Sequence, residues 1–339
     1  MQMPDPKTTT IRLKIILASL CALGATMFHP GASAQTRLDM AIFHIERDPF
    51  AETLRWWMAE VQKRTGDKVQ IRAHYAGSLA KLTEVFDAVR NGVVPMGLVA
   101  PSFISGVMPA MAYLELLGGF PSTQDGAEKA LPAMRPLMQK MFAGQGMVFL
   151  WQQPAFSVGV ACRDKVMRTP ADWKGLRVRT AGRWQAEQMK ALGAIPVAID
   201  PSEQYLALQS RAVDCALGIP TLLLGLKLNE VAPKITNLRM SVQSMVYVVN
   251  AKTWAGLSPS EREAISAASL EAEKRSIPFL FSSMDEYYGR LKAAKAEVQL
   301  VSDADLKAYR EAFRPVFESI GKTSDDTGRS LGDQLRKYW

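Results

Sequence analysis

Histidine and cysteine are scarce in this sequence of 339 residues, which contains three of each. One of each lies among the first 34 residues, so the rest of the chain keeps His44, His74, Cys162 and Cys215. The two histidines share no metal-binding spacing with each other or with a cysteine. We therefore expect no metal site and no cofactor; the sequence leaves open whether a metal ion assists ligand binding.

Local signatures of catalysis are also missing. The sequence has no G-x-S-x-G nucleophile elbow, no Walker loop and no G-x-G-x-x-G fingerprint. Paired catalytic carboxylates need not be close in sequence, however. A secreted enzyme that acts on a small carboxylate therefore stays an alternative to a binding protein.

Long hydrophobic runs are absent after residue 34, where no segment approaches the roughly 20 apolar residues that cross a membrane. The first residues differ, because three basic side chains precede an apolar run at 15–27 and three small residues follow at 32–34. This is the order of a cleavable secretory signal. We expect 1–34 to be a signal peptide and the mature chain, starting near Gln35, to be periplasmic.

Clustered charge of one sign is missing as well. The formal net charge is +8, and the segment 1–34 carries three basic residues and one acidic residue, so +6 remains after its removal. Basic residues are interspersed with acidic ones, which favours an anionic small solute over nucleic acid as the partner.

Two cysteines, Cys162 and Cys215, would remain in the exported chain. In an oxidising compartment they could pair. Two separately buried thiols are the alternative, and the sequence does not decide between them.

Short hydrophobic runs alternate with helical patterns along the chain. Strands are expected at 37–44, 68–75, 94–100, 156–162, 176–180, 195–199, 213–217 and 244–250. Helices are expected after Asp48-Pro49, at about 82–92 and after Asp200-Pro201. In the first and the last of them an acidic cap precedes proline. The alternation predicts an α/β fold with mostly parallel strands.

The longest predicted helix begins at Ser258 and continues to near Lys292, with a kink or break at Pro278. A helix of this length can link two lobes. We expect lobe I to comprise 35–156 with about 246–282, lobe II to comprise 157–245 with about 283–315, and a helical tail to occupy about 316–339.

Arg179 is the strongest candidate for ligand binding. It ends a short strand just before a turn at Gly182, and open α/β sheets bind ligands at the carboxyl ends of their strands. Its planar guanidinium can hold a carboxylate through two parallel hydrogen bonds. Arg177 points to the opposite face of the strand, since side chains alternate along it.

The stretch around Arg179 contains four spaced motifs. They are Gly175-Leu176-Arg177-Val178-Arg179, Gly193-Ala194-Ile195-Pro196, Ser202-Glu203-Gln204-Tyr205-Leu206-Ala207-Leu208-Gln209 and Val213-Asp214-Cys215. Together they resemble the solute receptors of tripartite ATP-independent periplasmic (TRAP) transporters, the DctP family. The resemblance extends over nearly the whole mature chain, although Cys215 stands where the family usually has glycine.

The resemblance implies a two-lobed periplasmic binding protein fold and no enzymatic activity. It also implies that Arg179 clamps the carboxylate of an organic acid, which is then delivered to membrane permease subunits. A receptor that signals to another partner is a further alternative, and we expect a monomer.

Other pocket candidates lie at predicted strand ends and nearby turns. They are Phe43, His44, Ser102, Trp151, Gln153, Phe156, Trp184 and Gly218. For each of them, core packing is an alternative to ligand contact.

Overall fold

The computed structural model describes residues 35–338, apart from the side chains of Phe156 and Ser241. The expected signal peptide, 1–34, lies outside the described residues. The strands are β1 (Thr36–Ala41), β2 (Val69–His74), β3 (Met96–Val99), β4 (Met147–Cys162), β5 (Arg177–Thr180), β6 (Ile195–Ala198), β7 (Cys215–Gly218), β8 (Lys234–Asn250) and β9 (Glu297–Leu300). The mixed α/β class expected from the sequence is confirmed.

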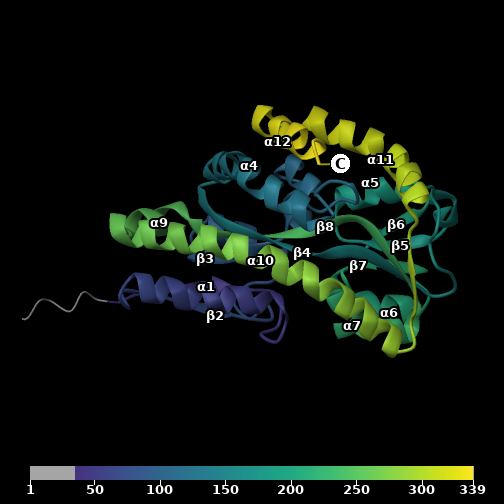
Figure 1. Cartoon of the computed structure of the whole chain (residues 1–339), viewed down its shortest axis with the longest axis horizontal. Coiled ribbons are helices and arrows are strands. Elements are labelled where there is room, and N and C mark those ends of the chain that lie inside the picture. Colours follow the sequence, from purple (N-terminus) through teal and green to yellow (C-terminus); the bar gives the residue numbers. More distant parts are fainter. Residues whose placement is uncertain (1–34, 339) are drawn as a thin grey trace, which may run out of the picture. The chain divides into compact units, whose positions relative to one another are not determined.

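Helices connect or cover these strands (Figure 1). They are α1 (Phe50–Arg64), α2 (Val85–Arg90), α3 (Pro101–Ile104), η1 (Pro109–Leu114), α4 (Gln124–Ala143), η2 (Pro170–Trp173), α5 (Arg183–Ala191), η3 (Pro201–Glu203), α6 (Gln204–Gln209), α7 (Pro220–Gly225), α8 (Leu228–Val231), α9 (Ala251–Gly256), α10 (Pro259–Ala293), α11 (Asp303–Thr323) and α12 (Asp326–Arg336). None of the helices within 35–338 has both the length and the hydrophobicity of a membrane span.

One sheet contains all these strands, in the order β2-β1-β3-β8-β4-β7-β5-β6, with β9 beside β8. Strands β4 and β8 pair antiparallel over their length, from Met147 opposite Asn250 to Cys162 opposite Lys234. One end of β8 pairs with β3, whereas the far end of β4 pairs with β7. The two long strands therefore pass through both halves of the sheet.

The expected strands at 156–162 and 244–250 are each only part of a longer strand. The β4–β8 register shifts between Pro154 and Ser157 and again between Ser157 and Gly159. Such bulges interrupt the alternation of side chains and bend the strand. A search for regular alternation therefore detects the segments on one side of the bulges and misses the remainder.

Helix α10 is the long helix predicted from Ser258. The Ser258 hydroxyl accepts a hydrogen bond from Glu261 N, and the Glu261 carboxylate accepts one from Ser258 N, which forms a capping box. The helix continues through Pro278 without a break. It packs on α1 next to one half of the sheet and on α7 next to the other (Figure 1), so it links both halves as expected.

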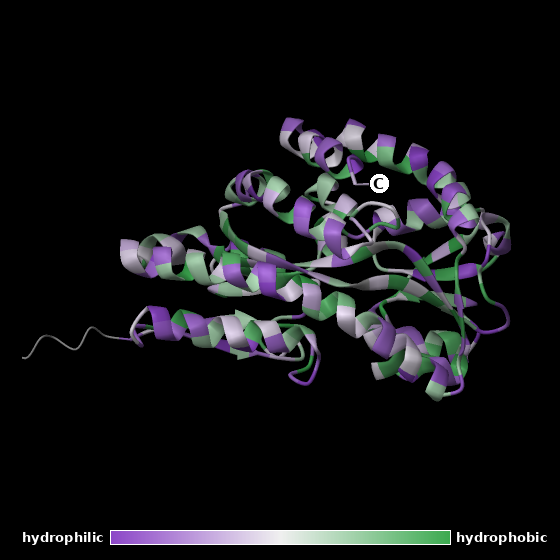
Figure 2. Ribbon diagram, viewed as in Figure 1, coloured by the Kyte–Doolittle hydropathy of each residue, from purple (hydrophilic) through white to green (hydrophobic). Residues whose placement is uncertain are grey.

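The C-terminal part is helical, as expected, but α11 begins at Asp303, before the predicted start of the tail. Apolar and polar residues alternate along α11 (Figure 2). The buried positions are Leu306, Tyr309, Phe313, Val316, Phe317 and Ile320, which recur at helical spacing. This stripe packs on α5 and η1.

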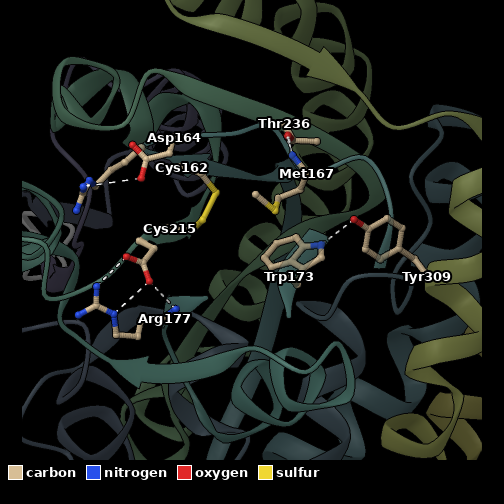
Figure 3. The surroundings of a disulfide bond; sticks show 10 residues. Cys162, Asp164, Met167, Trp173, Arg177, Cys215, Thr236 and Tyr309 are labelled. Carbon is tan, nitrogen blue, oxygen red and sulfur yellow. Dashed lines mark hydrogen bonds and ion pairs between the residues drawn. A yellow bond between two sulfur atoms is a disulfide. The ribbon is translucent and has the colours of Figure 1, made fainter. Parts of the chain in front are cut away.

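Cys162 and Cys215 form a disulfide bond (Figure 3). They are directly opposite each other in the β4–β7 ladder, with their Cα atoms 4.1 Å apart. The sequence left open whether these thiols pair. The bond ties the short strand β7, which ends at Gly218, to the long strand β4.

Candidate functional site

A cavity of about 820 Å³, here called the cleft, opens where strand ends from both halves of the sheet meet. Its walls include, from the β1–β3 half, Phe43, His44, Gly77 and Ser102, and from the β5–β7 half, Arg179, Asp200 and Gly218. All these residues lie at or after the carboxyl ends of parallel strands. Open α/β sheets bind ligands at this position, and the volume suits a small molecule.

Arg179 lies on β5, and its side chain is buried, with 3% exposure. Its Nε donates to the carbonyl oxygen of Ile199 at 2.8 Å, and Nη1 donates to that of Leu217 at 3.2 Å. The remaining amino group, Nη2, has no acceptor within the described part of the chain. Two backbone carbonyls thus fix the guanidinium and leave one donor group unused at the cleft.

Burial changes the protonation of the side chains around the cleft. It lowers the pKa of Arg179 to about 10, while the charges of Asp200 and Glu115 oppose this shift; the guanidinium stays positive at neutral pH. Burial also lowers the pKa of His44 to about 4 and raises that of Asp48 to about 6. His44 is therefore neutral, and its Nε2 has no partner among the described residues.

Arg177 differs from Arg179 although it lies only two residues away on the same strand. Its Nε and Nη2 donate to the two carboxylate oxygens of Asp214, at 3.1 and 2.8 Å. Figure 3 shows this pairing beside the disulfide. Arg177 is not among the residues that line the cleft. Arg177 therefore lies away from the cleft, as expected for the opposite face of the strand, and its charge pairs with that of Asp214.

Five of the candidates from the sequence meet at the cleft: Arg179, Phe43, His44, Ser102 and Gly218. The chain approaches itself closely here. A Cβ on Gly182 would lie 2.7 Å from the carbonyl oxygen of Ser102, so a larger residue at the start of α5 would force the two segments apart.

Three other candidates lie in the core and not at the cleft wall. Trp151 stacks on Tyr247 with ring centroids 4.0 Å apart, and Gln153 Nε2 donates to the carbonyl oxygen of Phe50 at 3.4 Å. Trp184 donates to the Ser105 carbonyl oxygen at 3.4 Å. Their strand-end positions suggested a pocket, but the β4 bulges and the packing of α5 turn them inward. Phe156 lies in β4, and its side chain is outside the described part of the structure.

Glu115 is a residue of the cleft that sequence reasoning missed. It follows η1 and is 1% exposed, between the buried Leu114 and Leu116. Burial raises its pKa to about 8; the Ser102 hydroxyl and the Arg179 charge oppose this shift, yet neither carboxylate oxygen has a hydrogen-bond partner in residues 35–338. A lone acidic residue inside the apolar run at 110–117 was the available signal.

A pH-dependent cost in stability is expected from Glu115. Folding raises the pKa of Glu115 from 4.5 to about 8, so the folded state holds a proton that the unfolded chain releases. The contribution of Glu115 to the free energy of unfolding is therefore complete below pH 4.5 and is lost as the pH rises to about 8. The advantage of Glu115→Gln in free energy of unfolding should therefore grow by about 4 kcal/mol between pH 5 and pH 9. Urea melts at both pH values measure it. An unchanged difference would mean that Glu115 is ionised throughout.

Within the described residues, no group of three or more histidine, cysteine, aspartate and glutamate side chains is arranged to hold a metal ion. Two basic side chains, Arg179 and Lys81, line the cleft, and backbone carbonyls fix the guanidinium of Arg179. A buried guanidinium with an unused N–H donor can bind an anion by direct hydrogen bonds.

Comparisons with known proteins agree with this geometry. Residues 40–323 match the model of the DctP family, described as bacterial extracellular solute-binding protein, family 7. A solute-binding protein of Albidiferax ferrireducens is 25% identical over 299 residues, which are 85% of this chain and 86% of that relative.

Two solved structures have the same fold. A Bordetella pertussis extracytoplasmic solute receptor that binds pyroglutamic acid aligns with a TM-score of 0.81 at 21% identity, over 89% of this chain and 99% of the receptor. A TRAP periplasmic solute-binding protein of a Sulfitobacter species, with bound β-D-galacturonate, aligns with a TM-score of 0.80 at 18% identity, over 89% of this chain and 100% of that protein. The chain thus has the two-lobed α/β fold of TRAP solute receptors and belongs to the DctP family, family 7 of the bacterial extracellular solute-binding proteins.

Proposed function

We propose that this chain is the solute receptor of a TRAP transporter, that it captures a small organic acid in the cleft, and that it delivers the acid to membrane permease subunits. The observation that carries this proposal is Arg179, which is buried, fixed by two backbone carbonyls and left with an unused donor at Nη2. A ligand carboxylate would complete the hydrogen bonds of this guanidinium. Pyroglutamic acid and galacturonate, the ligands of the two receptors above, each carry a carboxylate.

The bulges in β4 suggest how the cleft closes. We place lobe I at 35–156 with about 246–282 and lobe II at 157–245 with about 283–315. The register shifts between Pro154 and Gly159 then fall at the crossing point between the lobes. A bulge bends its strand and locally disrupts the ladder of hydrogen bonds. We propose that the lobes move about this point, and that ligand contacts from both lobes favour the closed state.

Family members are periplasmic or extracytoplasmic receptors. We propose that this chain is exported through the signal at 1–34, acts as a monomer and releases its ligand unchanged. A secreted enzyme would instead convert the ligand, and a signalling receptor would bind it without a permease. Incubating the protein with a bound acid and analysing the recovered molecule separates the enzyme from the receptor.

A thermal-shift screen tests the proposal. Small acids such as pyroglutamate, lactate and galacturonate are compared with their uncharged carboxamides, and at least one acid should raise the melting temperature while its amide does not. Stabilisation by a ligand follows its free concentration over Kd, about 2.7 kcal/mol at 100-fold excess over Kd. Stabilisation by amides and acids alike would refute an anion site.

A further inference from the structure

Glu115 has the Ser102 hydroxyl as a polar neighbour, which opposes the rise of its pKa on burial, but neither of its carboxylate oxygens is hydrogen-bonded within residues 35–338. The side chain is 1% exposed, and the neighbouring Leu114, Leu116 and Leu117 are buried at 2% exposure or less. Leaving a buried polar group unpaired is costly, so a carboxyl group at this position calls for a partner.

Glu115 and Arg179 face the same cleft. The charge of each side chain shifts the pKa of the other. Nη2 of Arg179 and the two oxygens of Glu115 nevertheless form no hydrogen bond among residues 35–338. The Nη2 group of Arg179 and both oxygens of Glu115 are thus buried, unpaired and adjacent to one cavity. A molecule that bonds to both would satisfy the two groups together.

We propose that Glu115 is a second recognition group of the cleft, and that it selects acids carrying a hydroxyl, oxo or lactam group close to the carboxylate held by Arg179. This inference rests on the proposed function, because it takes the carboxylate on Arg179 as given. A carboxyl group can donate to a hydroxyl or oxo oxygen and can accept from a hydroxyl or lactam N–H. A plain alkyl acid offers neither and leaves Glu115 unpaired, which is how a polar site rejects an unsubstituted analogue.

Two matched pairs of acids test the selection by calorimetry. Lactate is compared with propionate, and pyroglutamate with cyclopentanecarboxylate. The wild-type protein should prefer the substituted member of at least one pair by about tenfold or more, the effect of about one net hydrogen bond. Equal affinities within both pairs would overturn the proposal.

Two variants identify Glu115 as the source of this preference. Glu115→Leu keeps a similar volume in an apolar setting; it should fold and should reduce the preference to within about threefold, without weakening the plain acid. Glu115→Gln should retain part of the preference, since an amide also donates and accepts. Glu187→Ala removes a carboxylate of α5 that does not line the cleft, and it should change neither affinity.

Arg179→Ala separates this inference from the proposed function. If it abolishes binding of all four acids while Glu115→Leu keeps the full preference, the selection by Glu115 is refuted and the receptor function stands. If Arg179→Ala binds all four acids as the wild type does, the carboxylate clamp is refuted together with the inference.

Discussion

Arg179→Ala is expected to weaken the binding of a small carboxylate by about 100-fold or more. The Nη2 amino group is the donor left for the ligand, and its charge-assisted hydrogen bonding to a carboxylate in a water-excluded cleft contributes about 3 kcal/mol. Nε and Nη1 are held by Ile199 and Leu217, so the guanidinium is already oriented and little entropy is lost on binding. Isothermal titration calorimetry with the best acid of the screen measures the effect.

Arg177→Ala is the matched control for this variant. Both arginines lie on β5, but Arg177 pairs with Asp214 and not with the cleft. Its loss should leave affinity unchanged and lower stability slightly, because the pair is partly exposed. Arg179→Lys should also bind weakly, since an ammonium lacks the planar set of donors that bonds to Ile199 and Leu217 and keeps Nη2 for the ligand. A similar loss of affinity in the Arg177 and Arg179 variants would mean that the effect comes from β5 as a whole.

Removing the disulfide is expected to cost about 4 kcal/mol of unfolding free energy. Cys162 and Cys215 are separated by 53 residues, and a crosslink of this span restricts the unfolded chain substantially. Guanidinium melts of the double variant Cys162→Ala/Cys215→Ala, compared with the wild type, give the difference. Reduction of the wild type should produce a comparable loss.

A loss below about 1 kcal/mol in both experiments would contradict this expectation. It would show that the β4–β7 ladder, where the two residues are direct partners, holds the strands together without the crosslink. Ligand affinity should change little in either case, because neither cysteine lines the cleft.

Local patterns were sufficient for much of the fold. The capping box at Ser258 and Glu261 is formed, and the short strands β5, β6 and β7 lie within two residues of their expected ranges. Helix α4 was missed, since Pro132 and Pro136 lie inside it and proline normally marks a helix end. Surrounding contacts hold α4 in place, on α12 and β4, and they do not appear in a local pattern.

The candidate site could be predicted only in part. Arg179 was found because a strand, a turn and a planar cation coincide in one short stretch. Trp151 was a candidate for ligand contact with core packing as the alternative; it stacks on Tyr247 in the core and does not line the cleft, and a register shift of β4 lies next to it. Glu115 was missed because its importance comes from two segments, η1 and β5, that are distant in sequence and meet only in the folded chain.

A crystal structure of the protein with a bound organic acid is the sharpest test of the Arg179 clamp. We expect the ligand carboxylate within hydrogen-bond distance of Nη2 of Arg179, about 2.7 to 2.9 Å, with Ile199 and Leu217 still bonded to the same side chain. A carboxylate bound elsewhere in the cleft, with Arg179 paired to Glu115 or Asp200 instead, would contradict it.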